Sequence, residues 1–170
     1  MTDERGRETA SGGSVRERAV VGVISDTHGL LREEAVRALA GVGSIVHAGD
    51  VDSPEILERL ERIAPVRAVR GNVDHGSWAA ELPTTCVVEV GGRRLYVLHD
   101  PDDLDLDPAA AGFDVVIHGH THRTRNERID GVLYLNPGCA GPQRPGRSAS
   151  VAHLFVGVDP PEAEILELEV

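Results

Sequence analysis

Residues 19–50 of the chain, AVVGVISDTHGLLREEAVRALAGVGSIVHAGD, decide the fold that the sequence predicts. They begin with the apolar run VVGVIS at 20–25, which has the length and β-branched content of a buried strand. LREEAVRALAG at 31–41 then has apolar residues at helical spacing, and SIVHAGD at 44–50 is a second strand-like run. A strand, a helix and a strand in this order predict a βαβ unit with parallel strands.

The same alternation continues through one more helix and one more strand. SPEILERLERI at 53–63 is the predicted helix, with Pro54 in its first position. Asp52 or Ser53 is placed to begin it. APVRAVRGN at 64–72 is a third strand-like run, so this part of the chain predicts βαβαβ.

After residue 72 the strand-like runs become shorter, and the Gly91-Gly92 pair between two of them is typical of a hairpin. The runs are TTCVVEV, RRLYVLH, DVVIHG, ERI, VLYLN and SVAHLFV. We expect this half to be largely antiparallel. Because each half needs a partner for its buried face, the sequence predicts two sheets packed face to face with helices outside.

Composition limits the size and the partners of the protein. A chain of 170 residues with 41% hydrophobic residues has the material for one core, so we expect a single domain at 19–170. Residues 1–18 are polar and lack an apolar period, which predicts a flexible arm. The formal charge of -11 should repel nucleic-acid polymers and anionic membranes.

Hydropathy and cysteine usage indicate the compartment. The apolar stretches, such as residues 19–24, are too short to span a bilayer, so we expect a cytoplasmic protein. Cys86 and Cys139 form either one disulfide or two free thiols, and we expect free thiols because Cys139 lies in a Pro/Gly turn.

Metal-ligating residue types recur at the ends of the strand-like runs. Each of them lies at or just past the C-terminal end of a run, and they are Asp26, His28, Asp50, Asn72, His99, His120 and His122. Ligands of open α/β sheets bind beyond the carboxyl ends of the strands, so these side chains can converge from distant positions. In D-x-H and H-x-H, residues two apart on extended backbone point to the same side and can share a metal centre.

The ligand types indicate which metals fit. Carboxylate, imidazole and amide oxygen suit Mn, Fe, Zn, Co or Ni better than copper(I) or an iron–sulfur cluster. Two such ions about 3.5 to 4 Å apart generate hydroxide at neutral pH and polarise a phosphoryl oxygen. We therefore expect two divalent ions, with Mn favoured, and a phosphate ester as substrate.

Six motifs in order extend this interpretation. They are DTH (26–28), GD (49–50), GNVD (71–74), LH (98–99), GHTH (119–122) and NPG (136–138). From about Val21 to Gly138 the chain resembles the calcineurin-like metallophosphoesterases, and in particular their small bacterial and archaeal phosphodiesterase branch. The resemblance implies an α/β fold (α+β) built as a four-layer α/β/β/α sandwich.

The resemblance also implies roles for the ligands. Asp26, His28 and His122 would bind the first metal, and Asn72, His99 and His120 the second. Asp50 would bridge the two, since a carboxylate has two oxygens. A bridging hydroxide would then attack phosphorus. Asp74, two residues after Asn72, is a candidate to orient that amide or a histidine.

The chain departs from the family pattern at two places. Val73 stands where many relatives have a histidine that protonates the leaving group, and His75 is the candidate replacement. Asp100 follows His99 where relatives commonly have glycine, and it opens an acidic stretch that we expect to restrict bulky anionic substrates.

The sequence therefore predicts a metal-dependent phosphoesterase acting on a small phosphoester, with a phosphodiesterase favoured over a phosphomonoesterase. The candidate catalytic residues are Asp50, His99 and His75. No membrane or nucleic-acid polymer is expected as a partner, and a homo-oligomer is left open. The alternative is a non-catalytic scaffold on the same fold, whose signature would be missing metal-binding histidines; all seven ligand positions are filled here.

Overall fold

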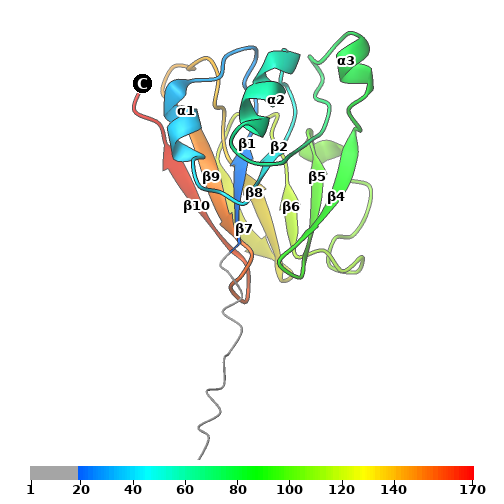
Figure 1. The fold of residues 1–170 in the computed structure, drawn as a ribbon. Helices are drawn as coiled ribbons and strands as arrows, with labels where there is room; N and C mark the ends of the chain where they lie inside the picture. Colours follow the sequence, from blue (N-terminus) through cyan, green and yellow to red (C-terminus); the bar gives the residue numbers. More distant parts are fainter. Residues whose placement is uncertain (1–18) are drawn as a thin grey trace, which may run out of the picture.

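The computed structural model describes residues 19–170, and within them ten strands form two five-stranded sheets (Figure 1). The first sheet contains, in spatial order, β10 (Glu162–Glu167), β9 (Ser150–Phe155), β1 (Val20–Ile24), β2 (Ser44–His47) and β3 (Val66–Ala68). The second contains β4 (Thr85–Val90), β5 (Arg93–Leu98), β6 (Val115–Ile117), β8 (Val132–Asn136) and β7 (Arg125–Ile129). The predicted arm at 1–18 lies outside the described residues.

The βαβαβ half forms as predicted. β1 pairs with β2 and β2 with β3, both in parallel, with α1 (Glu33–Ala38) and α2 (Pro54–Glu61) as the crossovers. Pro54 is the first residue of α2, and Ser53 takes the extended conformation of an N-cap. α1 is shorter than the predicted 31–41: it begins at Glu33 and ends at Ala38. The chain then turns through Gly41, whose φ of 83° is typical of a residue just after a helix.

The expectation of a largely antiparallel second half is confirmed, with two parallel pairings inside it. β4–β5, β7–β8 and β9–β10 are antiparallel, as is the pairing of β9 with β1, whereas β5–β6 and β6–β8 are parallel. Residues 99–114 connect β5 to β6, which gives the chain enough length to cross over and run parallel. The prediction also missed β10, the helix α3 (Ser77–Ala80) and the 3-10 helix η1 (Pro101–Asp103).

Three apolar layers hold the sandwich together. The central layer lies between the two sheets, where Val21 and Val46 of the first sheet and Leu95, Ile117 and Leu135 of the second are completely or almost completely buried. Burial of each such side chain contributes about 1.5–3 kcal/mol. Figure 1 shows both sheets in this face-to-face arrangement, with α1 and α2 over the first.

The outer layers differ in composition. Leu39 and Leu60 bring α1 and α2 against Ile45 on the outer face of the first sheet. On the outer face of the second sheet, Tyr96 packs in a cluster with Phe113 of the segment between β5 and β6. This segment carries η1, so the four-layer sandwich is confirmed with a mainly non-helical fourth layer.

Two further sequence expectations concern membranes and thiols. Within residues 19–170, no helix has the length and apolar content needed to cross a bilayer. Cys86 and Cys139 are both free thiols. The Cys139 thiol donates to the backbone carbonyls of Asp26 and Pro142, which is the role of a buried turn residue.

Candidate metal centre

The seven predicted ligands lie in the loops that follow β1, β2, β3, β5 and β6. The first three of these strands belong to one sheet and the last two to the other. Their carboxyl ends therefore bring residues from both sheets to one end of the sandwich. Contacts among the side chains divide the ligands into two groups.

The first group consists of Asp26, His28 and His122. Asp26 Oδ1 lies 3.1 Å from His122 Nε2 and 3.7 Å from His28 Nε2. The two Nε2 atoms are 3.2 Å apart. One carboxylate oxygen and two imidazole nitrogens thus converge on a space of the size that one cation occupies.

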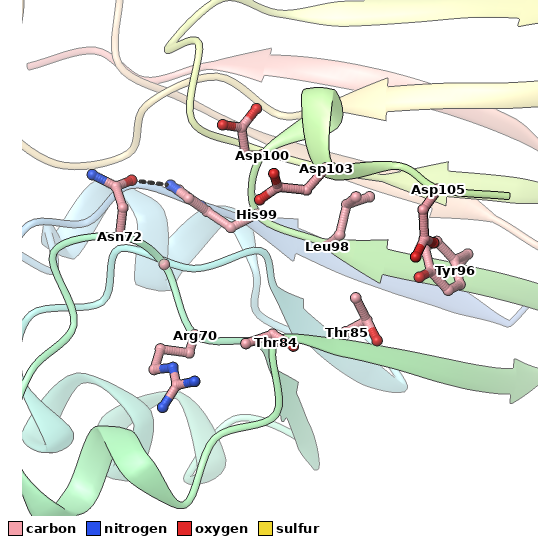
Figure 2. A pocket seen from close by; sticks show the side chains of 11 residues that line it. Arg70, Asn72, Thr84, Thr85, Tyr96, Leu98, His99, Asp100, Asp103 and Asp105 are labelled. Atoms are coloured by element: carbon pink, nitrogen blue, oxygen red, sulfur yellow. Dashed lines mark hydrogen bonds between the residues drawn. The ribbon is translucent and has the colours of Figure 1, made fainter.

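The second group is built around Asn72, whose Oδ1 lies 3.0 Å from His99 Nε2 and 3.1 Å from His120 Nδ1. Figure 2 shows the Asn72–His99 contact at one edge of a pocket. Asp50 Oδ2 lies 3.1 Å from His99 Nε2 and 3.9 Å from His28 Nε2 of the first group. Asp50 therefore faces both groups, and Asp26 of the first group also has a ligand atom within 4.8 Å of Asp50 and His99.

Asp50 faces both groups through Oδ2. Its other oxygen, Oδ1, accepts a hydrogen bond of 3.0 Å from the Val73 amide. The Val73 backbone thus fixes the orientation of the Asp50 carboxylate.

The ligand backbone is not extended, contrary to the expectation for D-x-H and H-x-H. Five of the seven ligands have positive φ angles between 46° and 69°, namely Asp26, His28, Asp50, His120 and His122. This left-handed conformation costs about 1 kcal/mol or more for a residue other than glycine. Backbone hydrogen bonds from Asp26 to Gly49 and from His28 to Asp50 hold the strained turns in place.

A glycine precedes Asp50, Asn72 and His120 in the motifs, and in each case a larger residue would clash with a neighbouring loop. A Cβ on Gly49 would lie 2.7 Å from His99 Nδ1. A Cβ on Gly71 would overlap Asp50, and one on Gly119 would overlap Ser25 and press on the Asp26 carboxylate. Each glycine therefore lets one ligand loop approach the next.

Several further residues support the candidate ligands. Ser25 donates to Asp26 Oδ2 at 2.6 Å, which leaves Oδ1 facing the first group. His99 Nδ1 lies 2.7 Å from the Ala48 carbonyl, so a proton there leaves Nε2 free to bind a cation. Asn136 donates to the Gly119 carbonyl and to Thr121, and so holds the loop that carries His120 and His122. Ser25 was not predicted, although its position directly before the DTH motif could have indicated it.

The buried Asp26 carboxylate indicates that the groups fit divalent cations. Asp26 is completely buried, and its Oδ1 accepts no hydrogen bond from any described residue. A buried acceptor without a donor is costly unless a cation neutralises it. Burial raises the pKa of Asp26, but the nearby His28, the hydrogen bond from Ser25 and the charges of His99 and His122 outweigh this and lower it overall. The carboxylate is therefore ionised at neutral pH.

Comparison with known proteins identifies the family. The calcineurin-like phosphoesterase superfamily domain matches residues 20–157. The chain belongs to this superfamily. A probable metallophosphoesterase of Methanothermobacter thermautotrophicus is 36% identical over 131 residues, which cover 70% of this chain and 76% of that protein.

Solved structures agree on the fold. The structure of an archaeal phosphodiesterase has a TM-score of 0.75 at 25% identity, covering 88% of this chain and 99% of its own. Vps29 of Entamoeba histolytica, solved in complex with zinc, has a TM-score of 0.65 at 21% identity over 88% of this chain and 99% of its own. Family membership and the two Asp/His groups together support a metal-dependent phosphoesterase.

The residues where the chain departs from the superfamily pattern lie as follows. Asp100 accepts from the Asp102 amide through Oδ1, while its Oδ2 lies 3.5 Å from His120 Nε2. His75 is exposed in the turn before α3, and the structure shows no hydrogen bond from its side chain to any described residue. The contacts that join the seven ligands therefore do not include His75.

Asp74, the residue predicted to orient a ligand, contacts the backbone of two loops. Asp74 does not orient a histidine or the Asn72 amide, because its two oxygens accept from the backbone amides of Asp52 and Gly71 at 2.8 Å each. Asp74 thus ties together the loops that carry Asp50 and Asn72.

His47 lies beneath the centre and gives a pH-dependent stability. It is completely buried; its Nδ1 accepts from the Gly49 amide, and its Nε2 lies 3.0 Å from the Thr27 hydroxyl. Burial lowers the pKa of His47 from 6.5 to about 4. As the pH falls, His47 therefore takes up a proton in the unfolded chain before it does so in the folded chain, and this favours unfolding. The folded protein has its full stability above pH 6.5 and loses part of it as the pH falls towards 4.

We expect this loss to amount to about 2–3 kcal/mol of unfolding free energy for the metal-free protein between pH 7 and 4.5. His47→Asn keeps an acceptor for the Gly49 amide but has no proton to gain, so its stability should fall less over the same range. Urea unfolding at both pH values measures the difference. Equal pH dependence in the two proteins would contradict the assignment.

Proposed function

We propose that the protein hydrolyses a small phosphate diester with two divalent metal ions, Mn²⁺ being the preferred metal. Asp26, His28 and His122 would hold one ion and Asn72, His99 and His120 the other, with Asp50 Oδ2 directed to both. The single observation that supports this most is that Asp50 Oδ2 lies within 4 Å of His28 and of His99, one from each group. When bound, such ions activate water and neutralise charge on phosphoryl oxygens.

The protein's own residues fix the orientation of the candidate ligands and keep Asp50 ionised. The Val73 amide and the Ala48 carbonyl fix Asp50 and His99. Hydrogen bonds from His99 and the Val73 amide lower the pKa of Asp50 overall, although burial raises it. The site therefore presents ionised carboxylates in fixed orientations, which avoids the cost of reorganisation during the reaction.

The site has fewer residues that could donate a proton to the leaving group. Val73 carries no proton donor, and His75 is the residue that we propose for this task. A diester with an acidic leaving group needs little protonation, so such esters should be the best substrates. The archaeal phosphodiesterase of similar fold supports the choice of a diester.

The decisive experiment is a panel of p-nitrophenyl monoesters and diesters and cyclic nucleotides, assayed with Mn, Ni, Zn and Mg. We expect diester turnover with Mn, its loss on chelation and its recovery when Mn is restored. Measurement of bound metal by mass spectrometry should give two ions per chain.

Metal content alone does not separate an enzyme from the scaffold alternative, since the fold neighbour Vps29 of Entamoeba histolytica was solved with zinc. If protein that holds two ions per chain hydrolyses none of the esters in the panel, the result would favour the scaffold. Turnover that persists after complete chelation would instead contradict the metal-dependent mechanism.

A further inference from the structure

A pocket of about 560 Å³ opens beside Asn72 and His99 of the second ligand group (Figure 2). Tyr96 and Leu98 of β5 line it on the outer face of the second sheet. Tyr96 precedes His99 by three residues, which corresponds to about 10 Å along a strand. The pocket is therefore continuous with the candidate metal centre, and its volume is in the range of small-molecule sites.

The lining of this pocket is mainly acidic. Asp100, Asp103 and Asp105 line it from the segment after β5, and Arg70 is the one arginine among the residues that line it. Figure 2 shows Arg70 on the side of the pocket opposite to Asp103 and Asp105. The side chains of Asp103 and Asp105 form no hydrogen bond or ion pair with any residue in 19–170. The pocket therefore favours a cationic group over an anionic one.

Tyr96 provides an independent indication of a bound group. It is only 9% exposed and lines the pocket, yet its hydroxyl forms no hydrogen bond with the part of the chain that the structure describes. Its ring packs against Phe113 with the ring centroids 5.1 Å apart, which holds the side chain in place. A tyrosine hydroxyl that is largely buried usually has a hydrogen-bond partner. This hydroxyl is thus available to a ligand in the pocket.

From these features we infer that the pocket holds a substituent of the substrate that ends in a primary ammonium group. The inference rests on the proposed function, because the phosphate is taken to lie between the two ligand groups. Asp103, Asp105 and the Tyr96 hydroxyl are acceptors, and an ammonium group offers three donors together with a positive charge. An uncharged substituent leaves the carboxylates without a counter-charge. The substrate class is a phosphodiester of an amino alcohol.

Binding of two isosteric monoesters to the full chain with Mn tests the pocket without any turnover. 5-Aminopentyl phosphate carries the ammonium group, and n-hexyl phosphate has a methyl group in its place. Calorimetry compares wild type with Asp103→Asn/Asp105→Asn and with the control Asp102→Asn/Glu58→Gln, which removes the same amount of charge. Asp102 and Glu58 are exposed and do not line the pocket.

We expect the amine to bind about tenfold more tightly than the hexyl ester to wild type and to the control. This preference should disappear in Asp103→Asn/Asp105→Asn. Tyr96→Phe removes only the hydroxyl and should reduce the preference about threefold.

Three results would overturn the inference: no preference for the amine in wild type, an undiminished preference in Asp103→Asn/Asp105→Asn, or an equal loss in the control. Turnover of the p-nitrophenyl diesters of the same two alcohols separates it from the proposed function. If neither diester is hydrolysed while the preference depends on Asp103 and Asp105, the proposed function fails and the pocket assignment stands. If both are hydrolysed with equal kcat/KM and the monoesters bind equally, the pocket assignment fails and the function stands.

Discussion

Asp50→Ala is expected to lower kcat/KM for diester hydrolysis by about a thousandfold or more, because it removes the oxygen that both ligand groups share and with it several kcal/mol of transition-state stabilisation. Asp50 Oδ2 lies near His99 and His28, so its loss weakens both cation sites together. The bound metal should fall well below two ions per chain. Steady-state kinetics and metal analysis on the same preparation measure both effects.

Asp130→Ala is the matched control for this variant. Asp130 has a φ of 51°, close to the 55° of Asp50, but it is exposed in the turn between β7 and β8. Strain from alanine in the left-handed conformation is thus similar in the two variants, and only Asp50→Ala removes a ligand. Activity retained in Asp50→Ala with two ions bound would refute the shared-ligand role.

Gly71→Ala is expected to have the second largest effect, although it adds only a methyl group. A Cβ at this position would overlap the carboxylate and the amide nitrogen of Asp50. The Asp50 loop must therefore move away from the other ligands. Displacement of a catalytic group by about 1 Å can cost about a hundredfold in rate, and we expect a decrease of this size in kcat/KM together with weaker metal binding.

Gly43→Ala provides the comparison for Gly71→Ala. A Cβ on Gly43 would lie 3.6 Å from the Val20 carbonyl, an ordinary contact, and neither glycine has a positive φ. Gly43→Ala should therefore keep wild-type kinetics and metal affinity. Urea unfolding of both variants shows whether the Gly71 effect is confined to the site. Wild-type activity in Gly71→Ala would mean that the ligand loops are not packed as tightly as the structure indicates.

Much of the fold and of the site was predictable because the signals are local. The run at 20–25 has the composition of a buried strand, and the helices at α1 and α2 have the periodicity of one apolar face. The ligands follow these strands directly, and parallel strands end at one edge of a sheet. The charged edge strand β10, EAEILE, was missed although apolar residues alternate in it, because it resembles a solvated segment.

The sequence by itself determined the strand and helix pattern of the first half and the seven residues with ligand chemistry. The tertiary structure alone decided the parallel pairing of β6 with β5 and β8, the left-handed backbone at five candidate ligands and the position of Asp50 Oδ2 near both groups. Periodicity and motifs report the environment of each residue along its own segment, whereas these features depend on contacts between segments far apart in the chain.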